Sequence, residues 1–153
     1  MNLVHATCVR MHDAGLLLTG LSGSGKSDLA LRLIGRGARL VGDDYVYVGS
    51  ENGALYAVAP LEIAGKLEVR GIGIAELGHA RICRVAAVIE LCSDAIDRLP
   101  QSRTAVIDGV SLPLLSLNPF EAAACEKLLI LLQGLLPKGA ARVGRFGDHG
   151  FDA

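Results

Sequence analysis

The sequence contains no tryptophan, and aromatic residues make up only 4% of its 153 positions. Charged residues are also scarce at 20%, and they nearly cancel to a net charge of −1 without any basic block. Because nucleic-acid binding needs clustered lysine and arginine to displace counterions, this charge pattern argues against a nucleic-acid partner. Hydrophobic residues supply 51% of the chain, which predicts a globular core built mainly of aliphatic side chains.

Signals for export or membrane insertion are lacking as well. The first residues show no basic stretch followed by an apolar run, and the apolar stretch Leu128–Leu132 is far too short to cross a bilayer. We therefore expect no membrane partner. The cysteines, Cys8, Cys83, Cys92 and Cys125, have no C-x-x-C spacing, which favours free thiols in the cytoplasm. The low net charge also favours association into an oligomer, because self-repulsion is weak.

One glycine-rich run carries the strongest chemical signal. Residues 20–27 match the pattern G-x-x-x-x-G-K-[ST], follow an apolar run and precede leucines at helical spacing. In such a P-loop, backbone N–H groups and the positive end of the next helix face the phosphates of a nucleotide such as ATP. Lys26 is expected to reach the β- and γ-phosphates, and the Ser27 hydroxyl to ligate Mg²⁺. The residues assigned to this cradle are Gly20, Leu21, Ser22, Gly23, Ser24, Gly25, Lys26 and Ser27.

The remaining pattern predicts an α/β fold, a P-loop kinase-like domain whose mixed central sheet is flanked by helices. The best helix by pattern is Pro119–Leu136, capped by Asn118, and Glu51–Gly53 is typical of a hairpin turn. One domain is expected over residues 1–137, followed by a mobile tail over residues 138–153. Strands are expected at Val4–Arg10, Leu16–Thr19, Ala38–Val41, Tyr45–Val48, Ala54–Val58 and Arg84–Leu91, with one or two more between Thr104 and Leu115.

A P-loop enzyme needs a further carboxylate near the metal and, for transfer to a hydroxyl, a base. Asp43 and Asp44 follow an apolar strand, at the kind of strand end where sites in open α/β sheets form. Adjacent strand residues point to opposite faces, so one of the two acids is expected to face the P-loop, and spacing leaves open which one. The alternative is a turn with two solvated carboxylates. Glu90 and Asp108, which also belong to apolar segments, are rival acids.

Three further polar residues remain ambiguous by spacing alone. Glu68 and Arg70 share one face of an extended segment, which suits a metal–phosphate site and a surface ion pair equally well. His5 is alone on the first strand, where a histidine is more often structural but can tune a nearby acid.

Two separated motifs resemble a known family. The first runs from His5 through the P-loop to Arg36–Asp44, and the second is Leu67–Ile74. In this order they resemble the HPr kinase/phosphorylase sequences, and the similarity extends from about His5 to Leu99. The chain looks like a short form of that family that consists of the catalytic domain alone.

The resemblance implies an ATP- and Mg²⁺-dependent kinase that phosphorylates a serine of HPr, the phosphocarrier of the sugar phosphotransferase system. Carried over by position, Asp44 is the catalytic base, His5 supports it, and Lys26 stabilises the transferring phosphoryl group. Ser27 and Glu68 are the implied Mg²⁺ ligands.

The same resemblance implies a catalytic role for Arg98, which matches an arginine of a mobile loop, and assembly into hexamers. It also implies reverse phosphorolysis, in which inorganic phosphate removes the phosphate from HPr. The family bears an arginine in a segment before its last helix, whereas the corresponding Pro113–Asn118 has none. Because bound phosphate favours such a cation, the reverse reaction is the less expected of the two.

Two other functions share the P-loop. A kinase of small metabolites would need a closed acceptor pocket and lid arginines, and few arginines here are placed for a lid. A nucleotide-sensing regulator would bind the triphosphate and turn it over little. Incubation with labelled ATP and purified HPr separates these functions from the protein kinase.

Overall fold

The computed structural model describes residues 1–135, so the tail expected at residues 138–153 lies outside the described part of the chain. In chain order the elements are β1 (Asn2–His5), β2 (Thr7–Met11), β3 (Ala14–Thr19), α1 (Lys26–Ile34), β4 (Arg39–Gly42), β5 (Tyr45–Glu51), β6 (Ala54–Val58), the 3-10 helix η1 (Leu61–Ile63), β7 (Lys66–Val69), β8 (Gly73–Glu76), β9 (Cys83–Leu91), β10 (Thr104–Ile107), β11 (Val110–Leu117) and α2 (Ala124–Leu135). None of the described helices is long and apolar enough to span a membrane.

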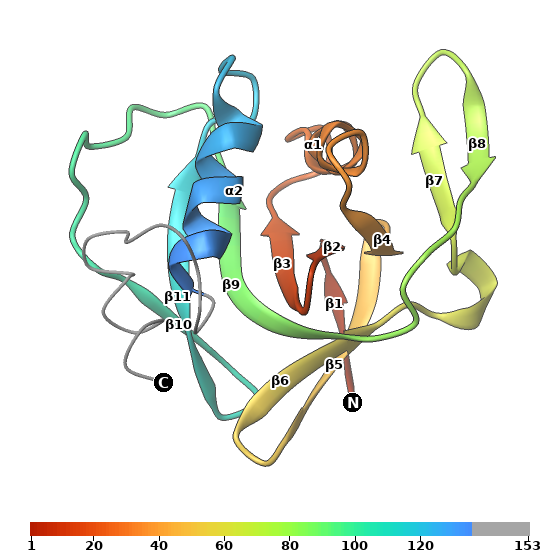
Figure 1. Cartoon of the computed structure of the whole chain (residues 1–153), viewed down its shortest axis with the longest axis horizontal. Helices are drawn as coiled ribbons and strands as arrows, with labels where there is room; N and C mark the ends of the chain where they lie inside the picture. The colour runs from red at the N-terminus through yellow and green to blue at the C-terminus, as the bar shows by residue number, and fades with distance from the viewer. Residues whose placement is uncertain (136–153) are drawn as a thin grey trace.

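A mixed, curled sheet of nine strands organises the molecule (Figure 1). Its main path runs β1-β5-β6-β9-β3-β2-β4, and β11 pairs with β9 while β10 pairs with β11. The pairs β3–β9 and β9–β11 are parallel, and β2 lies antiparallel between β3 and β4. Strands β3, β4, β9 and β11 therefore run in one direction, and their carboxyl ends meet at one edge of the sheet.

Strand β3 is buried on both faces, which explains its uninterrupted apolar sequence. Leu16 and Leu18 pack in the cluster that includes both helices, and Leu17 packs in a second cluster on the opposite face. The second face is covered by β5 and β6, because the sheet curls back on itself (Figure 1). The expected mixed sheet with helices is confirmed, with both helices on one face and strands over the other.

Most of the expected strands are confirmed, including a hairpin whose two-residue turn, Asn52–Gly53, has positive φ at both positions. The single strand expected at Val4–Arg10 is divided at Ala6 into β1 and β2, which join different neighbours. A second, two-stranded sheet made of β7 and β8 stands beside α1 (Figure 1).

The start of the last helix was predicted wrongly. Helix α2 begins at Ala124 rather than Pro119, because the Asn118 side chain accepts a hydrogen bond from the N–H of Phe120 at 3.0 Å. Such a local bond stabilises a turn in competition with the helix. The consequence is a non-helical segment, residues 118–123, between β11 and α2.

All the cysteines are free thiols, as the sequence predicts. Cys8 and Cys83 come from strands on either side of β3, and their sulfur atoms lie 3.5 Å apart. The hydrogen bond with Cys83 and burial together raise the pKa of the Cys8 thiol well above its ordinary value. Gly15 permits this contact, because a Cβ there would lie 2.4 Å from the sulfur of Cys83.

Candidate active site

The glycine-rich loop lies between the carboxyl end of β3 and the first residue of α1, in the context that its sequence predicts. Gly20, Gly23 and Gly25 all have positive φ, at 149°, 82° and 101°. A Cβ at Gly20 would also lie 2.6 Å from the hydroxyl oxygen of Ser24. The curl of the loop therefore depends on glycine at these positions.

The lysine at the start of α1 lies inside the loop. Lys26 is only 6% exposed, and its ammonium donates to the carbonyls of Gly20 and Leu21 at 2.9 and 3.0 Å. The Ser24 hydroxyl is buried without a hydrogen-bond partner among the described residues. A buried unpaired hydroxyl is costly, and a phosphate oxygen is a strong acceptor for it. The loop thus fits the phosphates of a nucleotide.

The two adjacent acids after β4 make different contacts. Asp43 accepts hydrogen bonds on one carboxylate oxygen from the hydroxyls of Ser27, at 2.6 Å, and Thr7, at 3.1 Å. The Thr7 hydroxyl also accepts a bond from the N–H of Asp44 at 3.0 Å, and Thr7 is fully buried. The structure thereby answers the question that spacing left open, because Asp43 is the acid that contacts the P-loop.

Asp44 points to a histidine instead. One of its carboxylate oxygens lies 2.7 Å from Nε2 of His5, whose ring stacks on Tyr45 with 5.1 Å between centroids. The His5 and Asp44 side chains are 36% and 56% exposed, so both are accessible from the solvent.

The backbone at Asp44 is strained. Its φ is 68°, and the N–H of Tyr45 donates to the carbonyl of Asp43 at 2.7 Å, which together describe a three-residue γ-turn. Non-glycine residues in this region are uncommon and concentrate at functional sites. The turn is what directs two adjacent carboxylates to separate partners at one strand end.

The segment 67–74 forms the β7–β8 hairpin rather than part of the main sheet. Glu68 is exposed on β7, whereas Leu67 is fully buried and anchors the hairpin. Within residues 1–135, no hydrogen bond or ion pair joins Glu68 to Ser27 or to Arg70. The implied role of Glu68 in Mg²⁺ binding stays a prediction.

The rival acids have other partners. Glu90, on β9, accepts a hydrogen bond from Ser116 at 3.1 Å and lies 3.7 Å from Arg103. Asp108 lies in the β10–β11 turn, as its neighbour Gly109 indicates, and accepts a bond from the N–H of Ser50 at 2.7 Å. That bond lowers the pKa of Asp108 below its ordinary value.

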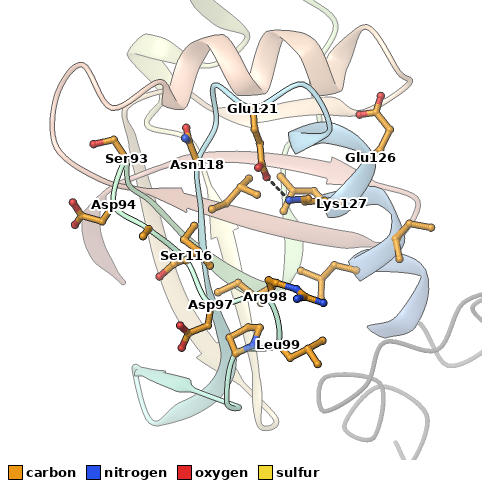
Figure 2. A pocket seen from close by; sticks show the side chains of 18 residues that line it. Ser93, Asp94, Asp97, Arg98, Leu99, Ser116, Asn118, Glu121, Glu126 and Lys127 are labelled. Atoms are coloured by element: carbon orange, nitrogen blue, oxygen red, sulfur yellow. Dashed lines mark hydrogen bonds and ion pairs between the residues drawn. The ribbon is translucent and has the colours of Figure 1, made fainter.

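Arg98 belongs to an exposed loop that forms one wall of an open pocket, and α2 with the end of β11 forms the other (Figure 2). Arg98 and Asn118 lie at opposite ends of this pocket in Figure 2, and Glu121 pairs with Lys127 at 2.6 Å in its wall. The structure thus brings His5, Asp44, Asp43 and the P-loop together, whereas Arg98 lines the pocket beside α2, which none of these residues lines.

Sequence reasoning missed two components of the site. The first is Thr7, which bonds to both acids; its only signal is that it follows His5 by two positions in the same run. The second is the turn after β11, where Pro119 and Phe120 lie against Gly25 of the P-loop. No spacing rule connects residues so far apart in the chain.

A P-loop at the carboxyl end of the central strand β3, with its serine bonded to an aspartate that follows the parallel strand β4, defines the class of P-loop kinase-like domains. The comparisons with known proteins agree with this class. The family model described as HPr Serine kinase C-terminal domain matches residues 1–112, and the chain belongs to that family.

Relatives with known sequences are named HPr kinase/phosphorylase. The chain is similar to the protein of Clostridium novyi (strain NT), at 46% identity over 74 residues, 48% of this chain and 24% of that protein. It is similar to the protein of Geobacillus sp. (strain WCH70), at 49% identity over 72 residues, 46% of this chain and 23% of that protein. The chain therefore matches about a quarter of the length of these curated relatives.

A solved structure resembles the whole domain more completely. It is titled Structure of the Hpr(Ser) kinase/phosphatase from Coxiella burnetii, and it superposes with a TM-score of 0.77 at 28% identity. The likeness covers 87% of this chain and 95% of that one. It extends beyond the matched motifs to the architecture of the sheet.

Proposed function

We propose that this protein is an ATP-dependent protein serine kinase whose acceptor is HPr or an HPr-like phosphocarrier. The observation that carries the proposal is the pair of contacts that Thr7 links, Asp43 with Ser27 and Asp44 with His5. One acid lies at the P-loop serine, where P-loop enzymes hold Mg²⁺, and the other is accessible to a docked substrate. A pure nucleotide-binding protein has no need of the second pair.

The proton-transfer step is assigned to Asp44. His5 holds one carboxylate oxygen, Oδ1, and the other, Oδ2, accepts the proton of the seryl hydroxyl. The seryl oxygen then forms a bond to the γ-phosphorus of ATP, and the bond between that phosphorus and the β–γ bridging oxygen breaks to release ADP. Lys26 stabilises the negative charge on the transferring group.

The hydroxyl and carboxylate oxygens of Ser27 and Asp43 fit a hard cation such as Mg²⁺. Glu68 is added to this set by the family resemblance. Mg²⁺ held there would supply neutralisation of the phosphate charge. The contribution of the chain is to hold Ser27 and Asp43 together at 2.6 Å.

We extend the proposal to the reverse reaction, in which Asp44 returns a proton to the seryl oxygen while inorganic phosphate removes the phosphoryl group. The segment 113–118 lacks the arginine of the family, but Arg103 from outside it donates to the Ser116 hydroxyl at 3.0 Å. Arg103 therefore places a cation beside that segment through this hydrogen bond. Its presence supports retention of the reverse reaction, and the Glu90 carboxylate 3.7 Å away offsets its charge, which predicts a reduced rate.

The deciding experiment incubates the full chain with γ-labelled ATP, Mg²⁺ and purified HPr. Label on a seryl residue of HPr is the expected result, and Lys26→Ala should lower its rate about 10²-fold or more, as loss of a preorganised cation does. Label on a small molecule from a metabolite mixture would favour a metabolite kinase. Nucleotide binding without any transfer would favour a sensor. Either of these two results would overturn the proposal.

Adding excess inorganic phosphate to serine-phosphorylated HPr tests the reverse reaction in the same assay, with pyrophosphate as the product measured. Hexamer formation, which the family resemblance implies, is tested separately by sedimentation of the full chain. We expect both to be observed. A monomer in solution would contradict the hexamer without affecting the transfer assay.

A further inference from the structure

The P-loop has two unlike flanks at the carboxyl edge of the sheet. Strand β4 ends on one side of it, with Asp43 and Asp44, and β11 ends on the other, with the turn 118–121. The strand order β4-β2-β3-β9-β11 places the P-loop between these two ends, and Figure 1 shows α1 between β4 and α2. A nucleotide in the loop therefore has room to extend toward one flank with its γ-phosphate and toward the other with its nucleoside.

The flank at β11 presents an aromatic ring directly to the loop. A Cβ added at Gly25 would lie 3.3 Å from Cζ of Phe120 and 3.1 Å from Cγ of Pro119. Phe120 is nevertheless 65% exposed. The ring thus touches the P-loop along one edge and leaves much of its surface to solvent, in a chain with few aromatic residues.

A single exposed phenylalanine needs no explanation by itself. The backbone around Phe120, however, is fixed by polar side chains outside the hydrophobic core. The Asn118 side-chain oxygen accepts a hydrogen bond from the N–H of Phe120 at 3.0 Å. The Arg32 guanidinium of α1 donates a hydrogen bond to the carbonyl of Pro119. Pro119 is buried, which fixes the backbone immediately before the ring. The ring is therefore positioned by the same helix that carries the P-loop lysine.

From this arrangement we propose that Phe120 is the platform on which the nucleobase of the bound nucleotide stacks. The inference rests on the proposed function for the direction of the triphosphate, because transfer at Asp44 requires the γ-phosphate on the β4 flank. The ribose and base then leave the loop toward β11. A flat, π-faced ligand such as adenine matches an exposed ring, and a stack onto it needs no hydrogen bond to the base edge.

Binding measurements with two ligands test the platform. ADP carries phosphates and a base, whereas inorganic tripolyphosphate carries phosphates alone, and calorimetry measures both dissociation constants for the full chain. Phe120→Leu keeps an apolar side chain and removes the π-face. We expect it to weaken ADP binding by about tenfold, within the range measured for base stacking on aromatic residues, and to leave tripolyphosphate binding unchanged.

Two further variants control this comparison. Phe120→Trp keeps an aromatic face and introduces the only tryptophan of the chain, so its fluorescence should respond to ADP and not to tripolyphosphate. Leu61→Ala removes a 90% exposed apolar side chain on η1 and should change neither constant. Both variants are expected to bind ADP within about twofold of the wild type, which is the scatter of ordinary surface changes.

The result that overturns the platform is an unchanged ADP constant in Phe120→Leu, or an equal loss for both ligands, which would mean that the loop itself is distorted. Failure of the proposed function has a different signature. If the proposed function is wrong, the wild type fails to label HPr, or Lys26→Ala leaves tripolyphosphate binding intact.

Discussion

The two flanks of the P-loop are built in different ways. On the β4 flank, groups from three strand ends and α1 are joined by hydrogen bonds, with Thr7 bonding to both acids. On the β11 flank, one contiguous turn presents a ring, and its positioning depends on Asn118 and on Arg32. Under the roles proposed for the two flanks, the difference teaches that proton transfer needs convergent, non-local geometry, whereas holding a nucleoside needs only a fixed surface next to the loop.

The largest effect that separates the flanks is expected from Asp44→Asn. Asparagine tolerates the positive φ of this position and keeps the side-chain shape, so the variant should fold. It removes the proton acceptor, and transfer to HPr should fall about 10²-fold or more while ADP binding stays close to wild type. Steady-state rates and calorimetry measure the two quantities. A wild-type transfer rate in this variant would remove Asp44 from the mechanism.

A second effect concerns which acid accompanies Ser27 at the metal. Asp43→Asn disturbs the carboxylate that lies 2.6 Å from the Ser27 hydroxyl, and Glu68→Gln is the same change at the other proposed ligand, on the β7–β8 hairpin. We expect Asp43→Asn to raise the Mg²⁺ concentration needed for half-maximal transfer about 10-fold or more, as loss of a supporting ligand does. The titration uses Mg²⁺ at saturating ATP. A larger rise for Glu68→Gln would assign the metal to the hairpin instead.

Thr7→Val should have a smaller effect, and it acts only through other residues. Valine keeps the volume but leaves the N–H of Asp44 without its acceptor, at a cost of about 1–3 kcal/mol in the free energy of unfolding. The kcat for HPr should fall about tenfold while the KM for ATP stays constant, as misplacement of a base predicts. Thr7→Ser restores the hydroxyl and should restore kcat. If serine fails to do so, the hydroxyl is not the positioning group.

The β4 flank also shows how much of the site can be predicted from the sequence. The P-loop, its strand and its helix were predictable because their signals are local, with fixed spacing from Gly20 to Ser27 and apolar periodicity on both sides. The choice between Asp43 and Asp44 was not predictable, because it depends on the γ-turn at Asp44 and on Thr7, which lies 36 positions from Asp43. Alternation along a strand predicts that the side chains of adjacent residues point in opposite directions, but it does not say which groups lie on either side.

The helix start on the β11 flank was predicted wrongly for a related reason. Asn118, Pro119 and Glu121 form a good capping pattern, which predicts a helix from Pro119. The same asparagine can bond two residues ahead within a turn, and the structure has this alternative, with α2 starting at Ala124. The contact of Phe120 with Gly25 that follows from the turn is tertiary. Local propensity alone does not distinguish the two outcomes.

The smallest expected effect tests how α2 is attached beside the β11 flank. Arg36 of α1 pairs with Glu126 of α2 at 3.1 Å on the surface. The backbone N–H of Glu126 and then Arg36 hold the pKa of this carboxyl below its ordinary value of 4.5. Because the folded pKa is the lower one, the pair stabilises the fold above that value, and the gain is lost as the pH falls through the folded pKa.

Arg36→Gln should therefore lower the melting temperature slightly at neutral pH and low salt, as is usual for an exposed pair. The difference from the wild type should shrink at about pH 3 and at high salt, because protonation and screening each remove the attraction. ADP binding should not change, since Arg32 rather than Arg36 holds the turn that carries Phe120. A difference in melting temperature that is equal at both pH values would mean that Arg36 stabilises the helix pair by packing rather than by charge.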